Sequence, residues 1–254
     1  MKEPINIQLS DRLEGVGEYY FSRKLREIDQ MRAAGRRIIS LGIGSPDRPP
    51  HSSVVDRLHE VASRPDTHAY QSYKGAAVLR RAFSTWYADR YGVQLDPESE
   101  ILPLIGSKEG LMHICMTYQR KGDRVLIPNP GYPTYRSAVT LSGGEPKEYR
   151  LNAEGDWFPN FDEIESEGLE GVKMMILNYP QMPTGAVPTC EMFARVVEFA
   201  HRHSILLVHD NPYSFVRNAE PLSLLSVEGA KECAIELNSL SKSHNMAGWR
   251  IGMI

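Results

Sequence analysis

Five largely apolar runs recur along the second half of the chain, separated by segments that are long enough to form helices. They occupy residues 101–105, 125–127, 174–177, 205–208 and 233–237. The runs lack strict alternation of apolar and polar positions, so each is predicted to be a strand buried on both faces. Strands that alternate with helices indicate a mostly parallel sheet covered by helices, which is an α/β fold.

Helical periodicity is clearest over residues 191–203, where five apolar side chains fall on one stripe. Helices are also predicted over residues 53–62, over residues 76–91 with Gly92 as the stop, and within the charged segment 11–35. A strand-like segment, residues 37–41, follows the last of these. The next residues, 42–47, imitate a dinucleotide-binding fingerprint but lack its third glycine, so we interpret them as a loop.

Polar segments directly follow four of the apolar runs. Ligands of a parallel sheet bind beyond the carboxyl ends of its strands, so these segments are expected to converge. Residues 106–110 (GSKEG) lead into a helix, whose first N–H groups, with Ser107 and Lys108, are suited to bind a phosphate. Residues 128–133 (PNPGYP) form a stiff turn that can hold Tyr132 under a planar ring.

A carboxylate and a lysine complete this candidate site. Asp210 follows a buried strand, where a charge is costly unless paired, and a protonated pyridine nitrogen is a suitable partner; a helix cap or salt bridge is the alternative. Tyr213 would then lie near the phenolic oxygen of the same ring. Lys242 lies among small and hydroxyl residues, eight residues before Arg250, which suits a Schiff-base amine beside an anion site. A surface lysine is the alternative, but the four segments together favour pyridoxal phosphate on Lys242.

Composition narrows the class of protein only slightly. The chain has 254 residues, of which 41% are hydrophobic and 24% charged, and its formal net charge is −3. No basic stripe indicates nucleic-acid binding. The N-terminus lacks the apolar core of a signal peptide, and no apolar run is long enough to span a bilayer, so we expect a cytoplasmic protein without membrane contact.

Cysteine and histidine add no further site. The three cysteines are scattered and are expected to be reduced core residues. His201 and His203 point to different faces of one helix, and His209 and His244 have no partner cluster in the sequence. We therefore expect no metal site.

The chain resembles the class I/II pyridoxal-phosphate aminotransferases of fold type I over nearly its whole length. Residues 41–47 (LGIGSPD), 104–110 (LIGSKEG) and 128–133 (PNPGYP) look most like the branch with LL-diaminopimelate and alanine-type aminotransferases. The resemblance implies a three-layer sandwich around a mostly parallel sheet. Residues 48–254 would form the cofactor-binding large domain, and residues 1–47 an N-terminal arm and a contribution to the small domain.

By this resemblance, Lys242 is the Schiff-base lysine and proton carrier. Tyr70 would reach the phosphate of the partner subunit, which implies a homodimer, and Gly44 would lie near the substrate carboxylate. The implied cofactor contacts are Ser107, Lys108, Ser239 and Arg250 at the phosphate, Tyr132 stacked on the ring, Asp210 at the ring nitrogen and Tyr213 at the phenolic oxygen.

The sequence departs from the family pattern at Met182, where relatives carry an asparagine that donates a hydrogen bond to the phenolic oxygen. A thioether cannot donate. We expect that Tyr213, alone or with the amide of Gln181, makes this interaction, and that the pKa of the Schiff-base nitrogen is raised.

A second departure is that the sequence stops at Ile254, inside what should be another strand. Relatives continue into a further helix and a small domain that supplies an arginine for the substrate carboxylate. We therefore expect a truncated portion, or a fragment that cannot complete a site alone, with the small domain largely missing.

The resemblance implies an aminotransferase that moves an amino group from an L-amino acid to a 2-oxo acid. LL-diaminopimelate or alanine with 2-oxoglutarate are the candidate substrates. A β- or γ-lyase with the same cofactor is one alternative, and an inactive fragment or a non-catalytic member of the fold is another.

Overall fold

The computed structural model describes residues 5–14, 16–42, 44–216 and 218–254, in two compact units, Met1–Ser45 and Pro46–Ile254. The smaller unit contains the 3-10 helix η1 (Asp11–Leu13) and the helix α1 (Tyr20–Ala33). The strand predicted over residues 37–41 was wrong, because these residues have no regular structure. Ile39 and Leu41 are 90% and 93% exposed, so their apolar side chains have no core to join.

In the described part of the larger unit, the strands form one seven-stranded sheet in the order β1-β7-β6-β5-β4-β2-β3. The pairs from β3 through β6 are all parallel, whereas β7 is antiparallel to both β6 and β1. The mostly parallel α/β sheet is thus confirmed. The strands are β1 (Pro103–Leu104), β2 (Arg124–Asn129), β3 (Glu145–Arg150), β4 (Val172–Leu177), β5 (Leu206–Asn211), β6 (Ala234–Ser239) and β7 (Gly252–Met253).

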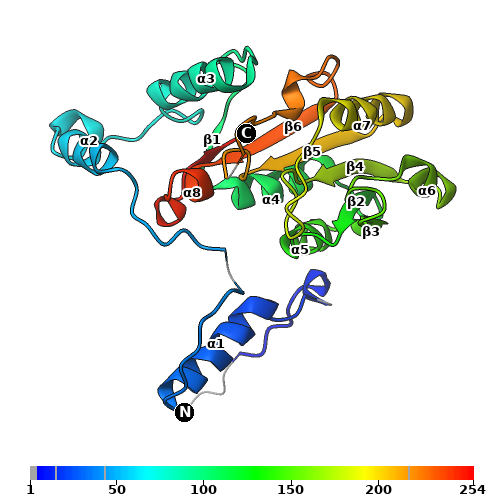
Figure 1. The fold of residues 1–254 in the computed structure, drawn as a ribbon, viewed down its shortest axis with the longest axis horizontal. Helices are drawn as coiled ribbons and strands as arrows, with labels where there is room; N and C mark the ends of the chain where they lie inside the picture. The colour runs from blue at the N-terminus through cyan, green and yellow to red at the C-terminus, as the bar shows by residue number, and fades with distance from the viewer. Residues whose placement is uncertain (1–4, 15, 43, 217) are drawn as a thin grey trace. The chain divides into compact units, whose positions relative to one another are not determined.

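Helices cover both faces of this sheet and give three layers (Figure 1). One face packs against α4 (Ser107–Tyr118) and α5 (Thr134–Leu141), and the other against α6 (Phe161–Ser166) and α7 (Cys190–His203). The remaining helical segments are α2 (Ser52–Ala62), η2 (Pro65–Thr67), α3 (Ala77–Tyr91), η3 (Leu224–Ser226), α8 (Leu240–Ser243) and η4 (Ala247–Trp249).

The buried strands send successive side chains to opposite layers. In β4, Met174 and Ile176 pack with α4 and α5, whereas Met175 and Leu177 pack with α6 and α7. This alternation is the ordinary period of a strand, and both faces are apolar because both are covered. The same alternation in β5 directs His209 and Asp210 to different layers.

Local signals set the ends of the helices. The Thr189 hydroxyl accepts a hydrogen bond from Met192 N at 3.0 Å and begins α7, as expected for an N-cap threonine. Gly92, at φ +68°, ends α3 in the left-handed conformation that glycine adopts readily. Both helices were predicted. Strand β3 was missed because its sequence EPKEYR is largely polar, as suits an edge strand.

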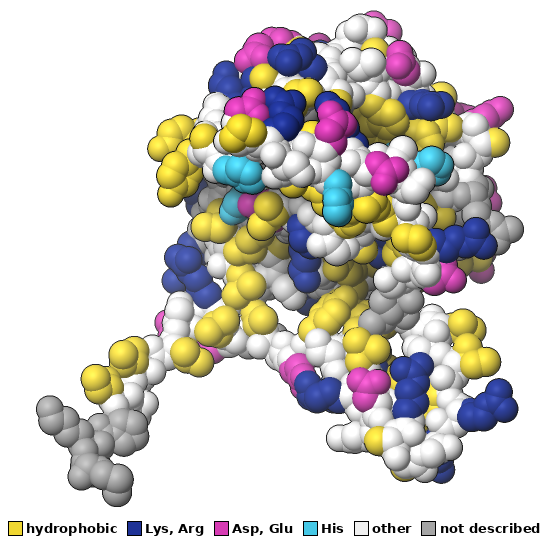
Figure 2. Space-filling view, turned by 90° about the vertical axis from the view of Figure 1, so that its left-hand side faces the viewer, with side chains coloured by type: hydrophobic (Ala, Val, Ile, Leu, Met, Phe, Trp, Pro, Cys, Tyr) yellow, Lys and Arg dark blue, Asp and Glu magenta, His cyan; other side chains and the backbone are white. Residues whose placement is uncertain are grey.

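The surface of the larger unit is chemically mixed. On the face seen in Figure 2, acidic and basic side chains are interspersed among hydrophobic ones. Over the described ranges, no helix is long and apolar enough to cross a membrane.

Candidate functional site

A cavity of about 260 Å³ lies at the carboxyl ends of the parallel strands and collects most of the predicted site residues. Its position is the one expected for ligands of a parallel sheet. Eight predicted residues line it: Ser107, Lys108, Tyr132, Asp210, Tyr213, Ser239, Lys242 and Arg250. The convergence expected from the four polar segments is therefore observed, and it gives the cavity one carboxylate, three cationic side chains and several hydroxyls.

One end of the cavity is suited to an anion. Helix α4 begins at Ser107, so its first backbone N–H groups and the positive end of its dipole lie here. Gly106 precedes it at φ +103°, and a Cβ on this residue would lie 2.9 Å from Cζ of Arg250. The guanidinium therefore packs directly over the glycine, and Arg250 itself is held in the left-handed region at φ +57°. Its Nη1 donates to the carbonyl of Ala247 at 3.0 Å, which fixes the side chain.

Asp210 forms the buried acidic wall of the cavity. One carboxylate oxygen, Oδ2, accepts a hydrogen bond from the Tyr135 hydroxyl at 3.0 Å, whereas the other, Oδ1, is buried without a hydrogen-bond partner. Burial raises the pKa of this carboxyl above its ordinary value, against the opposing effects of Tyr135, His209 and Ser107. A buried acceptor without a donor is costly, so a cationic N–H donor in the cavity would be strongly favoured.

Two tyrosines border the same space. Burial, with the negative charge of Asp210 and the neighbouring Tyr132, raises the pKa of Tyr213 to about 12. Tyr213 therefore remains a protonated hydrogen-bond donor at neutral pH. Tyr132 contacts Tyr135 edge-to-face with ring centroids 5.6 Å apart, which fixes the orientation of its ring.

Lys242 comes from the short helix α8, directly after β6. This helix begins at Ser239, whose hydroxyl accepts from Ser241 N at 3.2 Å and donates to the Ser241 hydroxyl at 2.9 Å. The half-buried Lys242 amine is thereby held at the edge of the sheet, in the same cavity as Asp210.

Two predicted site residues do not line this cavity. Tyr70 is fully exposed on the loop before α3. Gly44 belongs to the smaller unit, and a Cβ on it would meet nothing within 4 Å. The roles expected for both residues stay predictions.

Three further polar residues line the cavity that were not among the predicted site residues, namely Tyr135, Asn178 and Ser241. The Asn178 amide donates to the carbonyl of Asp210 at 2.8 Å, and its Oδ1 accepts from Met182 N at 2.9 Å. Asn178 directly follows a predicted strand, which was an available signal. Tyr135 is the second residue of α5 and carried no such signal.

Gln181 does not supply the donor that was expected beside Met182. Its amide nitrogen donates to the carbonyl of Pro130 at 2.8 Å, and its oxygen accepts from Thr184 N at 2.9 Å. The Gln181 side chain thus links the turn at Pro130 to the turn at Thr184, and the residue is only 3% exposed. Met182 and Tyr213 both line the cavity. The role of Tyr213 as the donor and the raised pKa of a Schiff-base nitrogen stay predictions.

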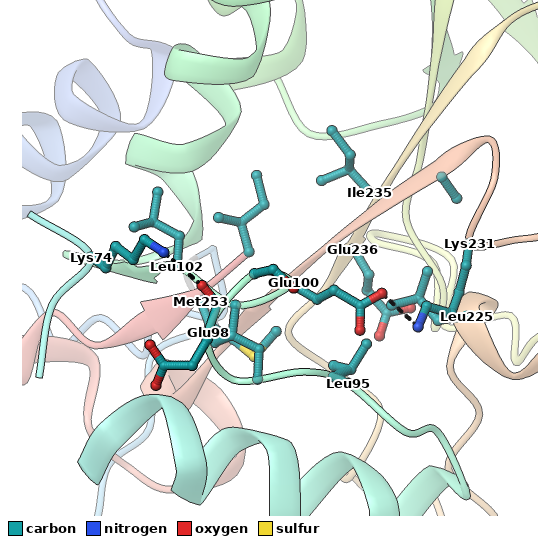
Figure 3. Close-up of a pocket in the computed structure, with 14 residues that line it drawn as sticks. Lys74, Leu95, Glu98, Glu100, Leu102, Leu225, Lys231, Ile235, Glu236 and Met253 are labelled. Carbon is teal, nitrogen blue, oxygen red and sulfur yellow. Dashed lines mark hydrogen bonds and ion pairs between the residues drawn. The ribbon is translucent and has the colours of Figure 1, made fainter. Parts of the chain in front are cut away.

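A larger cavity, of about 580 Å³, lies beside β1, β6 and β7 (Figure 3). Its charged residues are already engaged: Lys231 pairs with Glu100 at 2.6 Å, and Lys74 donates to the carbonyl of Glu98 at 2.9 Å. The rest of its lining is largely aliphatic. The smaller cavity, with its carboxylate and its cations, is therefore the candidate active site.

Comparison with known proteins agrees with this geometry. The family model for aminotransferase class I and II matches residues 36–254. The chain belongs to the class I and II aminotransferases. The cofactor of this family is pyridoxal 5′-phosphate, and the three-layer unit corresponds to the large domain of fold type I enzymes.

Individual relatives are similar over nearly the whole chain. An LL-diaminopimelate aminotransferase of Dehalococcoides mccartyi is 42% identical over 249 residues, 97% of this chain and 64% of the relative. The substrate-bound structure of BacF from Bacillus subtilis superimposes with a TM-score of 0.91 at 37% identity, over 98% of this chain and 63% of that one. A probable N-succinyldiaminopimelate aminotransferase from Thermus thermophilus gives 0.85 at 36% identity, over 92% and 63%. The chain thus spans about 64% of the length of the curated relatives it matches.

The aminotransferase cavity fits pyridoxal phosphate on three independent observations. The unpartnered Asp210 oxygen suits a protonated ring nitrogen, and the Gly106 turn with Arg250 suits a phosphate. The Lys242 amine lies in the same cavity and suits the carbonyl carbon. The residues present in the cavity therefore suit each part of the cofactor.

Substituting Gly106 with alanine tests the anion end of the cavity. We expect cofactor and inorganic phosphate affinity to fall by about tenfold, because the new Cβ displaces the Arg250 guanidinium. Titration followed by cofactor absorbance, with phosphate as competitor, measures the effect.

Gly122→Ala is the matched control for this substitution. Gly122 has φ +86°, but a Cβ on it would meet nothing within 4 Å, so the control shares the backbone strain without the steric contact. Equal affinity losses in both variants would assign the effect to strain and exclude the contact with Arg250.

Proposed function

We propose that the protein is a pyridoxal-phosphate-dependent aminotransferase whose amino donor is LL-diaminopimelate and whose acceptor is 2-oxoglutarate. The single observation that carries the reaction type is the meeting of Lys242, Asp210 and the Gly106 turn in one cavity. The donor is supported by relatives named LL-diaminopimelate aminotransferase, which are 38–42% identical.

In this proposal, the backbone of the α4 N-terminus binds the cofactor phosphate with Ser107, Lys108, Ser239 and Arg250. The helix dipole and the cations act together on the dianion. Tyr132 packs against one face of the ring, and the Tyr213 hydroxyl donates to its phenolic oxygen. Because the raised pKa of Tyr213 keeps this hydroxyl protonated, the donor is present throughout the neutral range.

Asp210 keeps the ring nitrogen protonated by accepting its hydrogen at the unpartnered Oδ1. When bound, the cofactor supplies a carbonyl carbon for the amino group and a cationic ring that draws electrons from the substrate α-carbon. Lys242 would hold the cofactor covalently until the amino donor replaces it, and its freed amine would then take the proton from the substrate α-carbon as general base. The same amine would then deliver that proton, as general acid, to the C4′ carbon of the cofactor, so one residue would serve both proton transfers.

The roles outside the cavity are also part of the proposal. Tyr70 would reach the phosphate of a partner subunit in a homodimer, and its full exposure leaves it accessible for that contact. Gly44 would lie near the substrate carboxylate. Residues 1–47 would form the N-terminal arm and part of the small domain, and residues 48–254 the large domain. We place the enzyme in the cytoplasm.

An amino-donor screen tests this function. The intact protein with pyridoxal phosphate should convert LL-diaminopimelate and 2-oxoglutarate to glutamate, faster than alanine or N-succinyl-LL-diaminopimelate. Preference for the succinylated donor would reassign the substrate. Release of ammonia without a 2-oxo acid would identify a lyase instead, and absence of all turnover despite a cofactor adduct would refute the catalytic proposal.

A further inference from the structure

The two neighbours of Asp210 in β5 are both held by one buried carboxylate, that of Glu236 in β6. His209 Nδ1 lies 2.7 Å from Glu236 Oε2, and the Asn211 amide donates to Glu236 Oε1 at 3.3 Å. Residues 209 and 211 point to one face of the sheet and Asp210 to the other. His209 and Glu236 are directly opposite in the ladder between β5 and β6. Glu236 therefore fixes the strand on either side of the acidic wall of the cavity.

Glu236 is a carboxylate, because every group around it donates. Besides His209 and Asn211, its oxygens accept from the hydroxyls of Tyr87 at 2.8 Å and Ser223 at 2.9 Å and from the Leu224 N–H at 2.9 Å. Burial by itself would raise the pKa of Glu236, but the hydrogen bond and charge of His209, with the two hydroxyls, lower it below its ordinary value.

His209 has an acceptor on each ring nitrogen. Nε2 lies 3.1 Å from the carbonyl oxygen of Tyr179, which can only accept, and Nδ1 faces the carboxylate of Glu236. With Glu236 ionised, both nitrogens donate, and the ring is then an imidazolium. Its side chain is fully buried, and Phe193 packs edge-on at 5.1 Å between ring centroids. The sequence had offered His209 no partner; the fold supplies two.

Two hydrogen bonds join the carboxyl ends of the neighbouring strands β4 and β5. The His209 ring binds the carbonyl of Tyr179 after β4, while the Asn178 amide binds the carbonyl of Asp210 in β5. The Asp210 carbonyl is thus held by Asn178, while the side chain of the preceding residue, His209, holds the carbonyl of Tyr179.

We propose that Glu236 and the imidazolium of His209 form a buried ion pair that positions Asp210 and supports its negative charge toward the cofactor ring nitrogen. This inference rests on the proposed function. Neither residue touches the cavity that holds Lys242, so both act through Asp210 as positioning residues.

Several charged and titratable groups surround Glu236, His209 and Asp210. Tyr87 and Tyr91 face Glu236 from α3, and burial raises the pKa of both, so they remain neutral. Tyr135 from α5 and Tyr213 face Asp210, and the cations Lys108, Lys242 and Arg250 share its cavity. Lys231 lines the larger cavity beside Glu236 but pairs with Glu100 (Figure 3). The positive charge of His209 lowers the pKa of Asp210, against the effect of burial.

The first test is nuclear magnetic resonance of the intact protein with ¹⁵N-labelled histidine. We expect both ring nitrogens of His209 to be protonated at neutral pH, with or without cofactor. An unprotonated Nδ1 would overturn the ion pair. This measurement does not depend on cofactor binding, so it separates a failure of this inference from a failure of the proposed function.

The second test is Glu236→Gln, which keeps the shape and removes the charge. His209 should lose the Nδ1 proton and keep the bond from Nε2 to Tyr179. The ¹³C titration of the Asp210 carboxyl should then shift to higher pH, because the nearer charge of the pair is lost. Cofactor affinity should fall about tenfold, which is the size of effect seen when a residue that supports a binding residue from behind is replaced.

His209→Gln is the second variant should Glu236→Gln not fold, and His203→Gln is the matched control. His203 ends α7 and forms a partly exposed pair with Glu165 at the same 2.7 Å distance; it has no recorded contact with Asp210 or Glu236, so its loss should change neither readout. Unchanged Asp210 titration and cofactor affinity in folded variants of the network would show a purely structural role and refute the proposal.

Discussion

Replacing Lys242 with alanine should reduce amino transfer by on the order of 10⁴-fold, because one side chain carries the covalent link and both proton transfers. Cofactor should still enter the cavity, since the phosphate and ring contacts come from other residues. Turnover assays measure the rate. Mass spectrometry after borohydride reduction should find the pyridoxyl group on Lys242 in the wild-type protein and on no residue of the variant.

Lys173→Ala controls for the loss of a lysine elsewhere. Lys173 is exposed at the start of β4, where it pairs with Asp123 at 3.1 Å, so its replacement should leave both rate and adduct unchanged. An adduct on Lys108 in the Lys242 variant would show that the cavity offers a second amine. Retention of more than about a hundredth of the wild-type rate would contradict the assignment of Lys242 as general base.

Asp210→Asn should reduce activity and raise stability together. Activity should fall about 10²–10³-fold, because the ring nitrogen loses its charged partner. The cofactor-free protein should gain about 1–3 kcal/mol, because a buried carboxylate with one unpartnered oxygen is replaced by a neutral group. For a domain of this size each kcal/mol corresponds to roughly 2–4 °C in Tm.

The pH dependence of this gain has a definite sign. The folded-state pKa of Asp210 is raised above its ordinary value of 3.8, so ionisation costs the wild-type protein stability as pH rises above 3.8. The difference in Tm between Asp210→Asn and wild type should therefore be small near pH 3.5 and grow toward neutral pH. A difference that shrinks with rising pH would show that the carboxylate is stabilised in the cofactor-free fold.

Much of the sheet was readable because buried parallel strands are continuous apolar runs. The runs located β2, β4, β5 and β6, and the residues after them located the cavity. Strand β3 escaped because an edge strand with one exposed side needs few apolar residues. The run at residues 37–41 misled for the opposite reason: it is apolar, but no described strand lies beside it to complete a ladder.

Side chains from helices and from opposite faces were harder to predict. Tyr135 and Asp210 lie on separate elements, and no local pattern records their hydrogen bond. Glu236 lies inside a run that was treated as apolar, and a charge there should have raised the question of its partner. That partner is His209, which lies directly opposite Glu236 in the ladder between β5 and β6.

Gly106 and Arg250 are far apart in the sequence, and they meet because β1 and β7, the strands beside them, pair in a ladder of only two residues. An anion bound by both would stabilise the pairing of β1 with β7. Phosphate binding and closure of the sheet edge are then thermodynamically linked, so a bound phosphate protects the strand ends from fraying, and their amide hydrogens should exchange more slowly.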